Sequence, residues 1–160
     1  MSSDATNVWD EVPDWGGIGA RPVARTGDLG ASIWELQPGG SQFVYHFHHG
    51  SDELLVVLAG HPTVRMHDGD RQLAEGDVVS FPRGPEGGHR IRNDSDTTAR
   101  VLIVSTNADP DVAEYPDTGK VAAISAGEHR YFRTADAVEH AGPEPVPEDD
   151  RGDPSRALDA

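Results

Sequence analysis

Turn residues divide the middle of this sequence, about residues 20–123, into short apolar runs of four to seven residues. The runs are rich in Val, Ile, Phe and Leu, which favour β-strands, and none has a sustained helical period. They are Ala31–Leu36, Gln42–His48, Leu54–Ala59, Thr63–His67, Arg71–Ala74, Val78–Phe81, His89–Arg92 and Arg100–Ser105. Asp68-Gly69 separates two of them and predicts a hairpin, because a primed turn needs positive φ. Many short strands with frequent turns predict an all-β sandwich or closed barrel.

Two stretches, Leu54–Leu58 and Val101–Val104, are apolar without the alternation of a half-exposed strand. Such strands are normally covered on both faces. We therefore expect a barrel wall with a further layer outside it. A second subunit would provide that layer, and the N-terminal arm is the alternative cover.

The length of the chain fits one domain with flanking segments. We expect an irregular N-terminal arm at residues 1–19, a barrel at 20–123 and a C-terminal extension at 124–160. Four apolar residues of the arm are candidates for docking on the core: Val8, Trp9, Val12 and Trp15. In the extension a short helix is expected at most near Thr134–His140. From about residue 141 prolines alternate with acids, which predicts irregular or disordered chain.

The composition excludes several classes of site and partner. There is no cysteine, which removes disulfides, thiolate metal sites and cysteine nucleophiles. The formal net charge of -15 repels phosphate backbones and argues against nucleic acid as a partner. No apolar run approaches the roughly 20 residues needed to span a bilayer, so we expect no membrane partner. The polar, acidic start lacks the order of a secretory signal, so we expect a cytoplasmic location.

Three histidines and one glutamate form the most specific pattern in the sequence. His46 and His48 are two apart in a strand-like run, so both imidazoles project to the same face. Glu53 follows across a turn-like segment, and His89 follows the loop Arg83–Gly88. Without thiolates, three imidazoles and a carboxylate suit one divalent ion, such as Fe, Mn, Ni, Co or Zn. A six-coordinate ion would keep two positions open for water or substrate.

Each of these residues also has a less specific interpretation. His46, His48 and Glu53 could form the polar, exposed face of a hairpin. Inward polar groups on apolar strands are costly without a partner such as a metal, which favours the metal site. His89 could be a loop histidine at the rim.

The spacing of these residues resembles the two sequence motifs of the cupin superfamily. The first motif is matched at every specified position, by Gly40, His46, His48, Glu53 and Gly60. The second is matched in order by Gly76, Pro82, Gly84, His89 and Asn93. It departs once, because four residues rather than two separate Gly84 from His89. The resemblance covers about Ala31–Ser105 and is to small, single-domain bacterial cupins.

This resemblance implies a double-stranded β-helix of the jelly-roll type, with a metal ion inside one open end of the barrel. It also implies a homodimer, because members commonly dimerise. Known cupins include dioxygenases, isomerases, decarboxylases, lyases and non-catalytic sensors, so the fold does not fix the function.

Strand parity predicts which residues surround the ligands. Residues two or four away from a ligand in the same strand should share its face. The pocket residues predicted in this way are Gln42, Val44, Leu55, Val57, Ile91 and Asn93. The pocket would be largely apolar, with Gln42 as a polar contact near the mouth and Trp34 as a further candidate. Asn93 either hydrogen-bonds behind a ligand or is a simple turn former.

Two arginines, Arg83 and Arg90, flank the glycine-rich loop before His89. One hypothesis is that this loop gates the pocket and that one of the arginines attracts an anionic substrate. The alternative is that Arg83 only offsets local acidity.

Three functions are compatible with the pattern. The first is a metal-dependent enzyme that acts on a small organic molecule, through dioxygenase-like oxygen activation or through Lewis-acid polarisation. The second is a non-catalytic cupin that binds or senses a small ligand. The third is a structural metal that stiffens the barrel, which the open coordination positions argue against.

Overall fold

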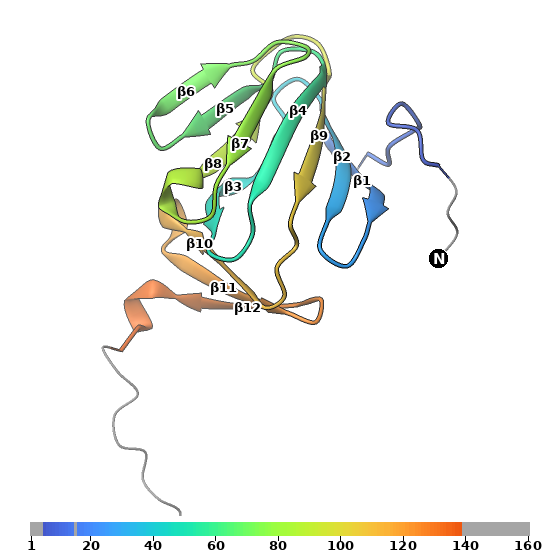
Figure 1. Cartoon of the computed structure of the whole chain (residues 1–160). Helices are drawn as coiled ribbons and strands as arrows, with labels where there is room; N and C mark the ends of the chain where they lie inside the picture. Colours follow the sequence, from blue (N-terminus) through green and yellow to red (C-terminus); the bar gives the residue numbers. More distant parts are fainter. Residues whose placement is uncertain (1–4, 15, 139–160) are drawn as a thin grey trace, which may run out of the picture.

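Two antiparallel β-sheets form the framework of the protein in a computed structural model that describes residues 5–14 and 16–138 (Figure 1). The five-stranded sheet has the order β1 (Ile18–Arg25), β2 (Gly30–Leu36), β9 (Ala99–Ser105), β4 (Glu53–Ala59), β7 (Val78–Phe81). The seven-stranded sheet has the order β12 (Glu128–Arg133), β11 (Lys120–Ser125), β10 (Asp111–Tyr115), β3 (Ser41–His48), β8 (His89–Arg92), β5 (Thr63–Met66), β6 (Gly69–Gln72). Three short 3-10 turns complete the described elements: η1 (Pro85–Gly87), η2 (Pro116–Thr118) and η3 (Thr134–Asp136).

The core lies between the two sheets, where the inward side chains of both meet. Leu55 and Val57 of β4 and Val101 of β9 are buried on one side, and Val64 and Ile91 on the other. Alternate residues of a strand point to the same face, so this packing follows from the apolar positions of the runs. Burying each such side chain contributes about 1.5–3 kcal/mol. The fold is the jelly-roll barrel that was predicted.

Each of the eight predicted apolar runs overlaps a β-strand, which confirms the all-β prediction. The hairpin between β5 and β6 also forms. Its pairing ends at Met66 and Gly69, so the two central turn residues are His67 and Asp68 rather than Asp68 and Gly69. Gly69 has a φ of 127°, a conformation that favours glycine.

Four strands, β1, β10, β11 and β12, have no counterpart among the predicted runs. β1 begins inside the predicted arm, β11 crosses the predicted boundary between residues 123 and 124, and β12 lies in the predicted extension. β12 is exposed at all six positions, and β1 carries Pro22, where its pairing with β2 changes register. Edge strands such as these two are held by backbone pairing on one side, so their side chains carry little apolar pattern. Of the predicted helix near 134–140, the described part forms only η3, and residues 139–160 lie outside the described residues.

The N-terminal arm docks on β9 through Arg100. The Nε of Arg100 donates a hydrogen bond of 2.9 Å to the Val8 carbonyl. Val12 is buried, whereas Trp9 is 59% exposed and its ring lies 5.8 Å from the Arg100 guanidinium. Trp15 lies outside the described residues. The arm therefore covers part of the outer face, and a second subunit as further cover stays a prediction.

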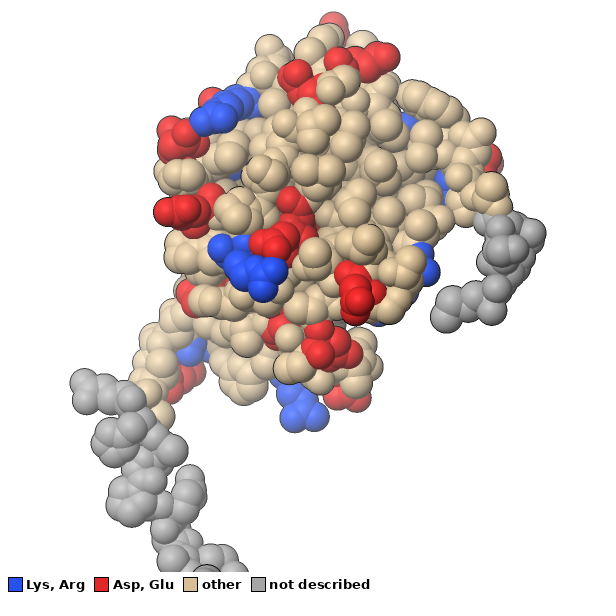
Figure 2. Space-filling view, in the orientation of Figure 1, with Lys and Arg blue, Asp and Glu red and all other residues tan. Residues whose placement is uncertain are grey.

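Charged side chains are dispersed over the face shown in Figure 2 in small groups, and several of these groups place bases beside acids. Several bases make ion pairs with nearby acids, such as Arg83 with Asp52 and Arg71 with Asp68. Exposed pairs of this kind contribute little to stability. Within residues 5–14 and 16–138, no helix has the length and apolar character needed to cross a membrane.

Replacing Leu55 with alanine tests the position of the core. Leu55 is fully buried, so Leu55→Ala should lower the free energy of unfolding by about 2–5 kcal/mol, measured by urea denaturation. Val78→Ala, on the neighbouring strand β7, is the control: Val78 is 58% exposed, and a change below about 0.5 kcal/mol is expected. Equal effects of the two substitutions would contradict this assignment of the core.

Candidate metal centre

A bulge in β3 places two of the predicted ligands opposite each other. In the pairing of β3 with β8, Gln42 faces Ile91 and His46 faces His89. Three residues of β3 therefore stand opposite a single residue of β8, which bends β3 locally. The rings of His46 and His89 lie with their centroids 4.8 Å apart.

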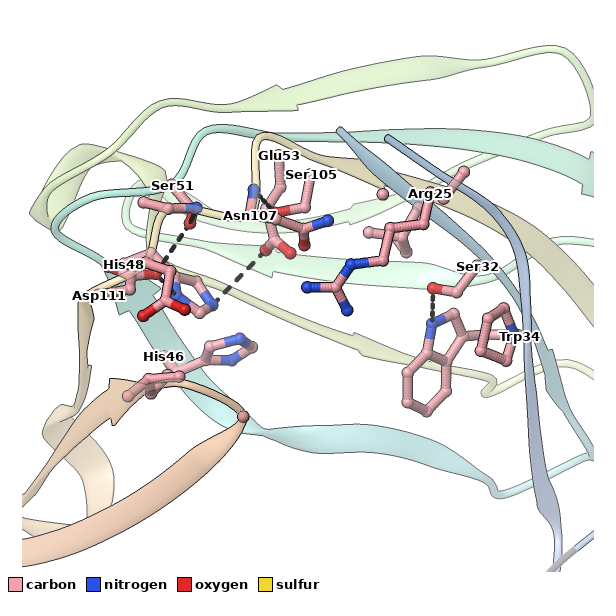
Figure 3. A pocket seen from close by; sticks show the side chains of 18 of the residues that line it. Arg25, Ser32, Trp34, His46, His48, Ser51, Glu53, Ser105, Asn107 and Asp111 are labelled. Carbon is pink, nitrogen blue, oxygen red and sulfur yellow. Dashed lines mark hydrogen bonds and ion pairs between the residues drawn. The ribbon is translucent and has the colours of Figure 1, made fainter. Parts of the chain in front are cut away.

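The four predicted ligands meet at one end of the barrel. His46, His48 and Glu53 each offer one ligand atom, and these atoms lie within 4.8 Å of one another. Glu53 begins β4 in the other sheet, so the group bridges the two sheets (Figure 3). The Oε2 atom of Glu53 lies 3.3 Å from Nε2 of His89 and 4.0 Å from Nε2 of His48.

The loop before His89 accommodates its two additional residues as the compact turn η1. A Cβ atom on Gly87 would clash with the Pro82 carbonyl, and one on Gly88 would clash with the Tyr45 hydroxyl. His89 itself is 3% exposed and stacks on Phe81, with ring centroids 3.8 Å apart. It is therefore a buried residue and not a loop histidine at the rim.

Each of the three imidazoles donates its Nδ1 hydrogen to a fixed oxygen. The acceptors are the Val44 carbonyl for His46 at 3.0 Å, Oδ2 of Asp111 for His48 at 2.7 Å, and the Gly87 carbonyl for His89 at 2.9 Å. Carbonyl and carboxylate oxygens only accept hydrogen bonds, which assigns the hydrogen of a neutral ring to Nδ1. Nε2 is then the nitrogen with the lone pair in all three rings, and lone-pair nitrogens are what a metal ion binds.

The protonation states also suit a cation. Burial, together with the neighbouring rings of His89 and His48, lowers the pKa of His46 to about 4. Burial alone would raise the pKa of Glu53, but the neighbouring histidines, His89 first among them, hold it below its usual value. Near neutral pH, His46 is therefore uncharged and Glu53 is ionised.

A cation between the ligands resolves an electrostatic conflict in this arrangement. In neutral His89 the Nε2 lone pair faces Oε2 of Glu53 at 3.3 Å, and two electron-rich atoms repel each other at that distance. A proton or a metal ion between them removes the repulsion. Neutral imidazoles and a carboxylate are the donors that divalent Fe, Mn, Ni, Co and Zn accept. The residues therefore fit the metal site that the sequence predicts.

The ligands line an open pocket with a volume of about 400 Å³. Its other wall comes from the five-stranded sheet and includes Trp34 and Ser32 of β2 (Figure 3). The indole Nε1 of Trp34 donates a hydrogen bond of 2.9 Å to the Ser32 hydroxyl, which fixes the ring. Gln42, 7% exposed, also lines this pocket. A small organic molecule fits such a volume.

Comparison with known proteins identifies the family. Residues 32–105 match the cupin domain family. The crystal structure of a putative sugar phosphate isomerase from Acidithiobacillus ferrooxidans is 32% identical with a TM-score of 0.65, over 69% of this chain and 70% of that one. The chain is a cupin.

Two further structures resemble this cupin at lower identity. A sugar phosphate isomerase from Silicibacter pomeroyi is 24% identical, covers 78% of this chain and 82% of its own, and has a TM-score of 0.69. KdgF from a Halomonas species is 23% identical and has a TM-score of 0.56, and the match covers 66% of this chain and 96% of KdgF. At these identities the likeness shows the fold alone. A comparison with curated proteins gives no match.

Sequence reasoning missed Asp111, which positions His48 in this cupin. Asp111 begins β10 and is 5% exposed. Besides His48, its carboxylate accepts hydrogen bonds from the Ser51 hydroxyl and the backbone N–H groups of Gly50 and Val112. Burial alone would raise the pKa of Asp111, but these bonds hold it below its usual value. No sequence signal marks it, because the motifs end before β10 and the contact depends on the pairing of β10 with β3.

Three of the residues predicted to line the pocket belong to the core instead. Leu55, Val57 and Ile91 are at most 1% exposed and pack in the hydrophobic cluster between the sheets. Strand parity placed them on the inner face correctly. It does not give the depth of a residue along the barrel, so it could not separate core residues from pocket residues.

Val44 also departs from its predicted place. The bulge between Gln42 and His46 breaks the alternation of β3. Val44 is 41% exposed and lines a second hollow next to the main pocket, together with Arg90. Parity fails here because it assumes an unbroken strand.

Asn93 is a turn former, the second of its two interpretations. It is fully buried, and its Nδ2 donates hydrogen bonds to the carbonyls of Leu36 at 2.8 Å and Thr97 at 2.7 Å. Its Oδ1 accepts the backbone N–H and the hydroxyl of Ser95. None of these bonds goes to His89.

The two arginines near the loop do not line the main pocket within the described residues. Arg83 pairs with Asp52 through its Nε and NH2 groups, which agrees with the alternative that it offsets local acidity. The Nε of Arg90 donates a hydrogen bond of 2.9 Å to the Ser41 hydroxyl. The hypothesis that either attracts a substrate into this pocket has no support from their positions.

The low pKa of His46 predicts acid sensitivity of the metal-free protein. Its pKa is about 4 in the folded state against 6.5 for an unperturbed histidine. The unfolded chain therefore binds more protons between these values, and stability falls as the pH drops through this window. His46 should account for a loss of about 2 kcal/mol between about pH 7 and pH 5. Urea denaturation at several pH values measures it.

The control for this prediction is His67→Asn, because His67 is an exposed histidine of the β5–β6 turn. This variant should keep the pH dependence of the original protein, whereas His46→Asn should flatten it. An unchanged slope in His46→Asn would show that another group causes the acid sensitivity.

Proposed function

We propose that this cupin is a metal-dependent enzyme that acts on a small organic molecule in the pocket of about 400 Å³. His46, His48, Glu53 and His89 would hold one divalent metal ion. The observation that carries the proposal is the placement of the three histidine rings: each Nδ1 lies within hydrogen-bond distance of an oxygen that only accepts, which leaves Nε2 for a cation. Glu53 faces two of these nitrogens.

The bound metal would supply Lewis-acid polarisation of a substrate oxygen. The residues of the chain do the positioning. Asp111 holds the His48 ring and, with all of its hydrogen bonds directed at the protein, serves as a positioning residue rather than as a base. Phe81 stacks on His89 and keeps water from that side of the ring.

Among the reactions that the resemblance implies, we propose isomerisation rather than the dioxygenase-like reaction. The support is the 32% identity to a putative sugar phosphate isomerase over more than two thirds of both chains. A metal-dependent isomerase uses an ion that polarises a substrate oxygen, and all five candidate metals do so. The homodimer and the cytoplasmic location stay predictions.

Removing one imidazole should remove the metal. Purified without chelator, the protein should carry about one divalent ion per chain, measured by inductively coupled plasma spectrometry. His46→Ala should lose that ion, the melting temperature gained from it, and isomerase turnover of sugar phosphates. His67→Ala should retain all three.

The outcomes separate the two classes of function. Loss of turnover in His46→Ala with an unchanged fold by circular dichroism supports the enzyme. Metal binding without turnover of any sugar phosphate would reject the isomerase and support the ligand-binding alternative. A metal-free protein that takes up no added Fe, Mn, Ni, Co or Zn would reject the metal centre itself.

Asp111→Asn tests the positioning of His48. The amide can offer a hydrogen to Nδ1 and favour the wrong tautomer, so metal affinity should fall by about 10- to 100-fold, measured by titration calorimetry. Asp68→Asn, in the exposed ion pair with Arg71, is the matched control and should leave the affinity unchanged. An Asp111→Asn protein that is folded and binds metal as tightly as the original would contradict this role.

A further inference from the structure

A single guanidinium enters the pocket beside the candidate metal centre. Arg25 is the last residue of β1, and its side chain projects into the pocket between Glu53 and Trp34 (Figure 3). It is the only lysine or arginine among the described residues that line this pocket. The sequence gives no sign of this, because an arginine at the end of an edge strand resembles any surface arginine.

Arg25 differs from most arginines of the barrel in its bonding. Other arginines pair with acids, such as Arg65 with Asp117 and Arg92 with Asp70. The side chain of Arg25, which is exposed, makes no hydrogen bond or ion pair with any of the residues 5–14 and 16–138. In a chain with a net charge of -15, a guanidinium that the described residues leave unpaired in a pocket is available to a ligand.

The acids of the pocket do not compete for Arg25. Glu53 faces the histidines, and Asp111 is saturated by its bonds to His48, Ser51 and backbone N–H groups. Asp109, exposed, accepts the N–H of Ala126 with both carboxylate oxygens. A divalent ion on Glu53 would further reduce the negative charge that Arg25 meets.

A second polar group lies on the same wall. Asn107 has a φ of 47°, in the left-handed region that asparagine adopts more readily than most other residues. Its amide lies where a Cβ atom of residue 30 would be, so only the glycine there leaves room for it. The backbone N–H of Asn107 donates a hydrogen bond of 3.2 Å to the Ser105 hydroxyl. Figure 3 shows the Asn107 side chain beside Glu53 and Ser105.

We propose that Arg25 binds an anionic group of the substrate, a carboxylate or a phosphate, while another part of the same molecule reaches the metal centre. The inference deepens the proposed function and rests on it for the metal end of the substrate only. A guanidinium offers two parallel N–H groups, which match the paired oxygens of a carboxylate or phosphate. Asn107 can donate a further hydrogen bond, and the fixed ring of Trp34 provides a flat apolar surface for the carbon skeleton.

Anion binding tests the proposal with two probes, inorganic phosphate and malonate, by titration calorimetry at low ionic strength. The protein should bind at least one probe, and the tighter probe identifies the class of anion. Arg25→Gln should weaken that binding by about 10- to 100-fold, because it removes hydrogen bonds to a charged group. Arg25→Lys should be intermediate, since it keeps the charge and loses the paired geometry.

Arg71→Gln is the matched control, because Arg71 is equally cationic but pairs with Asp68 on the β5–β6 hairpin. It should bind the probe within about twofold of the original protein. Equal binding by Arg25→Gln and the original protein, or binding of neither probe, overturns the proposal. All three arginine variants should retain the metal.

Failure of the metal proposal would be recognised separately. The variant His46→Ala should carry no metal, so probe binding is compared between it and the double variant that also has Arg25→Gln. Weaker binding by the double variant would support Arg25 as the anion site, whatever the role of the metal. Probe binding in His46→Ala that does not depend on Arg25 would contradict it.

Discussion

The mutual orientation of three imidazoles and one carboxylate is the constraint on which the rest of the structure depends. Buried polar groups are costly unless each is satisfied, and this site satisfies every Nδ1–H with an oxygen of the protein. The remaining nitrogens of His48 and His89 face Glu53, and a cation between these groups satisfies all three. The fold therefore prepares the site for a cation, and the bulge before His46 and the turn before His89 supply the two backbone carbonyls.

Strand register positions this group. β3 lies between β10 and β8, so one edge of β3 meets Asp111 and the other meets His89. The bulge before His46 adds two residues and brings that ring opposite His89. A shift of one residue in either pairing would reverse the face of every following side chain. The apolar residues between the sheets resist such a shift. The shift that displaced the ligands would also move these apolar side chains out of the core. Core packing and ligand placement are thus the same constraint.

The sequence predicts the fold and the four ligands well because both depend on local alternation and short spacing. It failed where position depends on distant pairing. Asp111 contacts His48 only because β10 pairs with β3, and Arg25 reaches the pocket only because β1 pairs with β2. Val44 was misplaced by a bulge that no residue type announces. Leu55 and Ile91 faced inward as predicted, but depth along the barrel is a property of the whole sheet. β12 has no apolar face, so no pattern revealed it.

An anionic substrate must approach a protein whose net charge is also negative. At physiological salt, charges more than about 8 Å apart are largely screened, so the overall repulsion mainly slows the encounter. Inside the pocket the nearest charges determine how strongly an anion binds. Arg25 makes no ion pair with Glu53 there, and the histidines orient Glu53 toward a cation. Attraction is therefore short-ranged and confined to the pocket. A ligand held by Arg25 at one end and by a metal ion at the other has two fixed points, which orient it along the pocket, and Trp34 then limits the skeleton that fits between them.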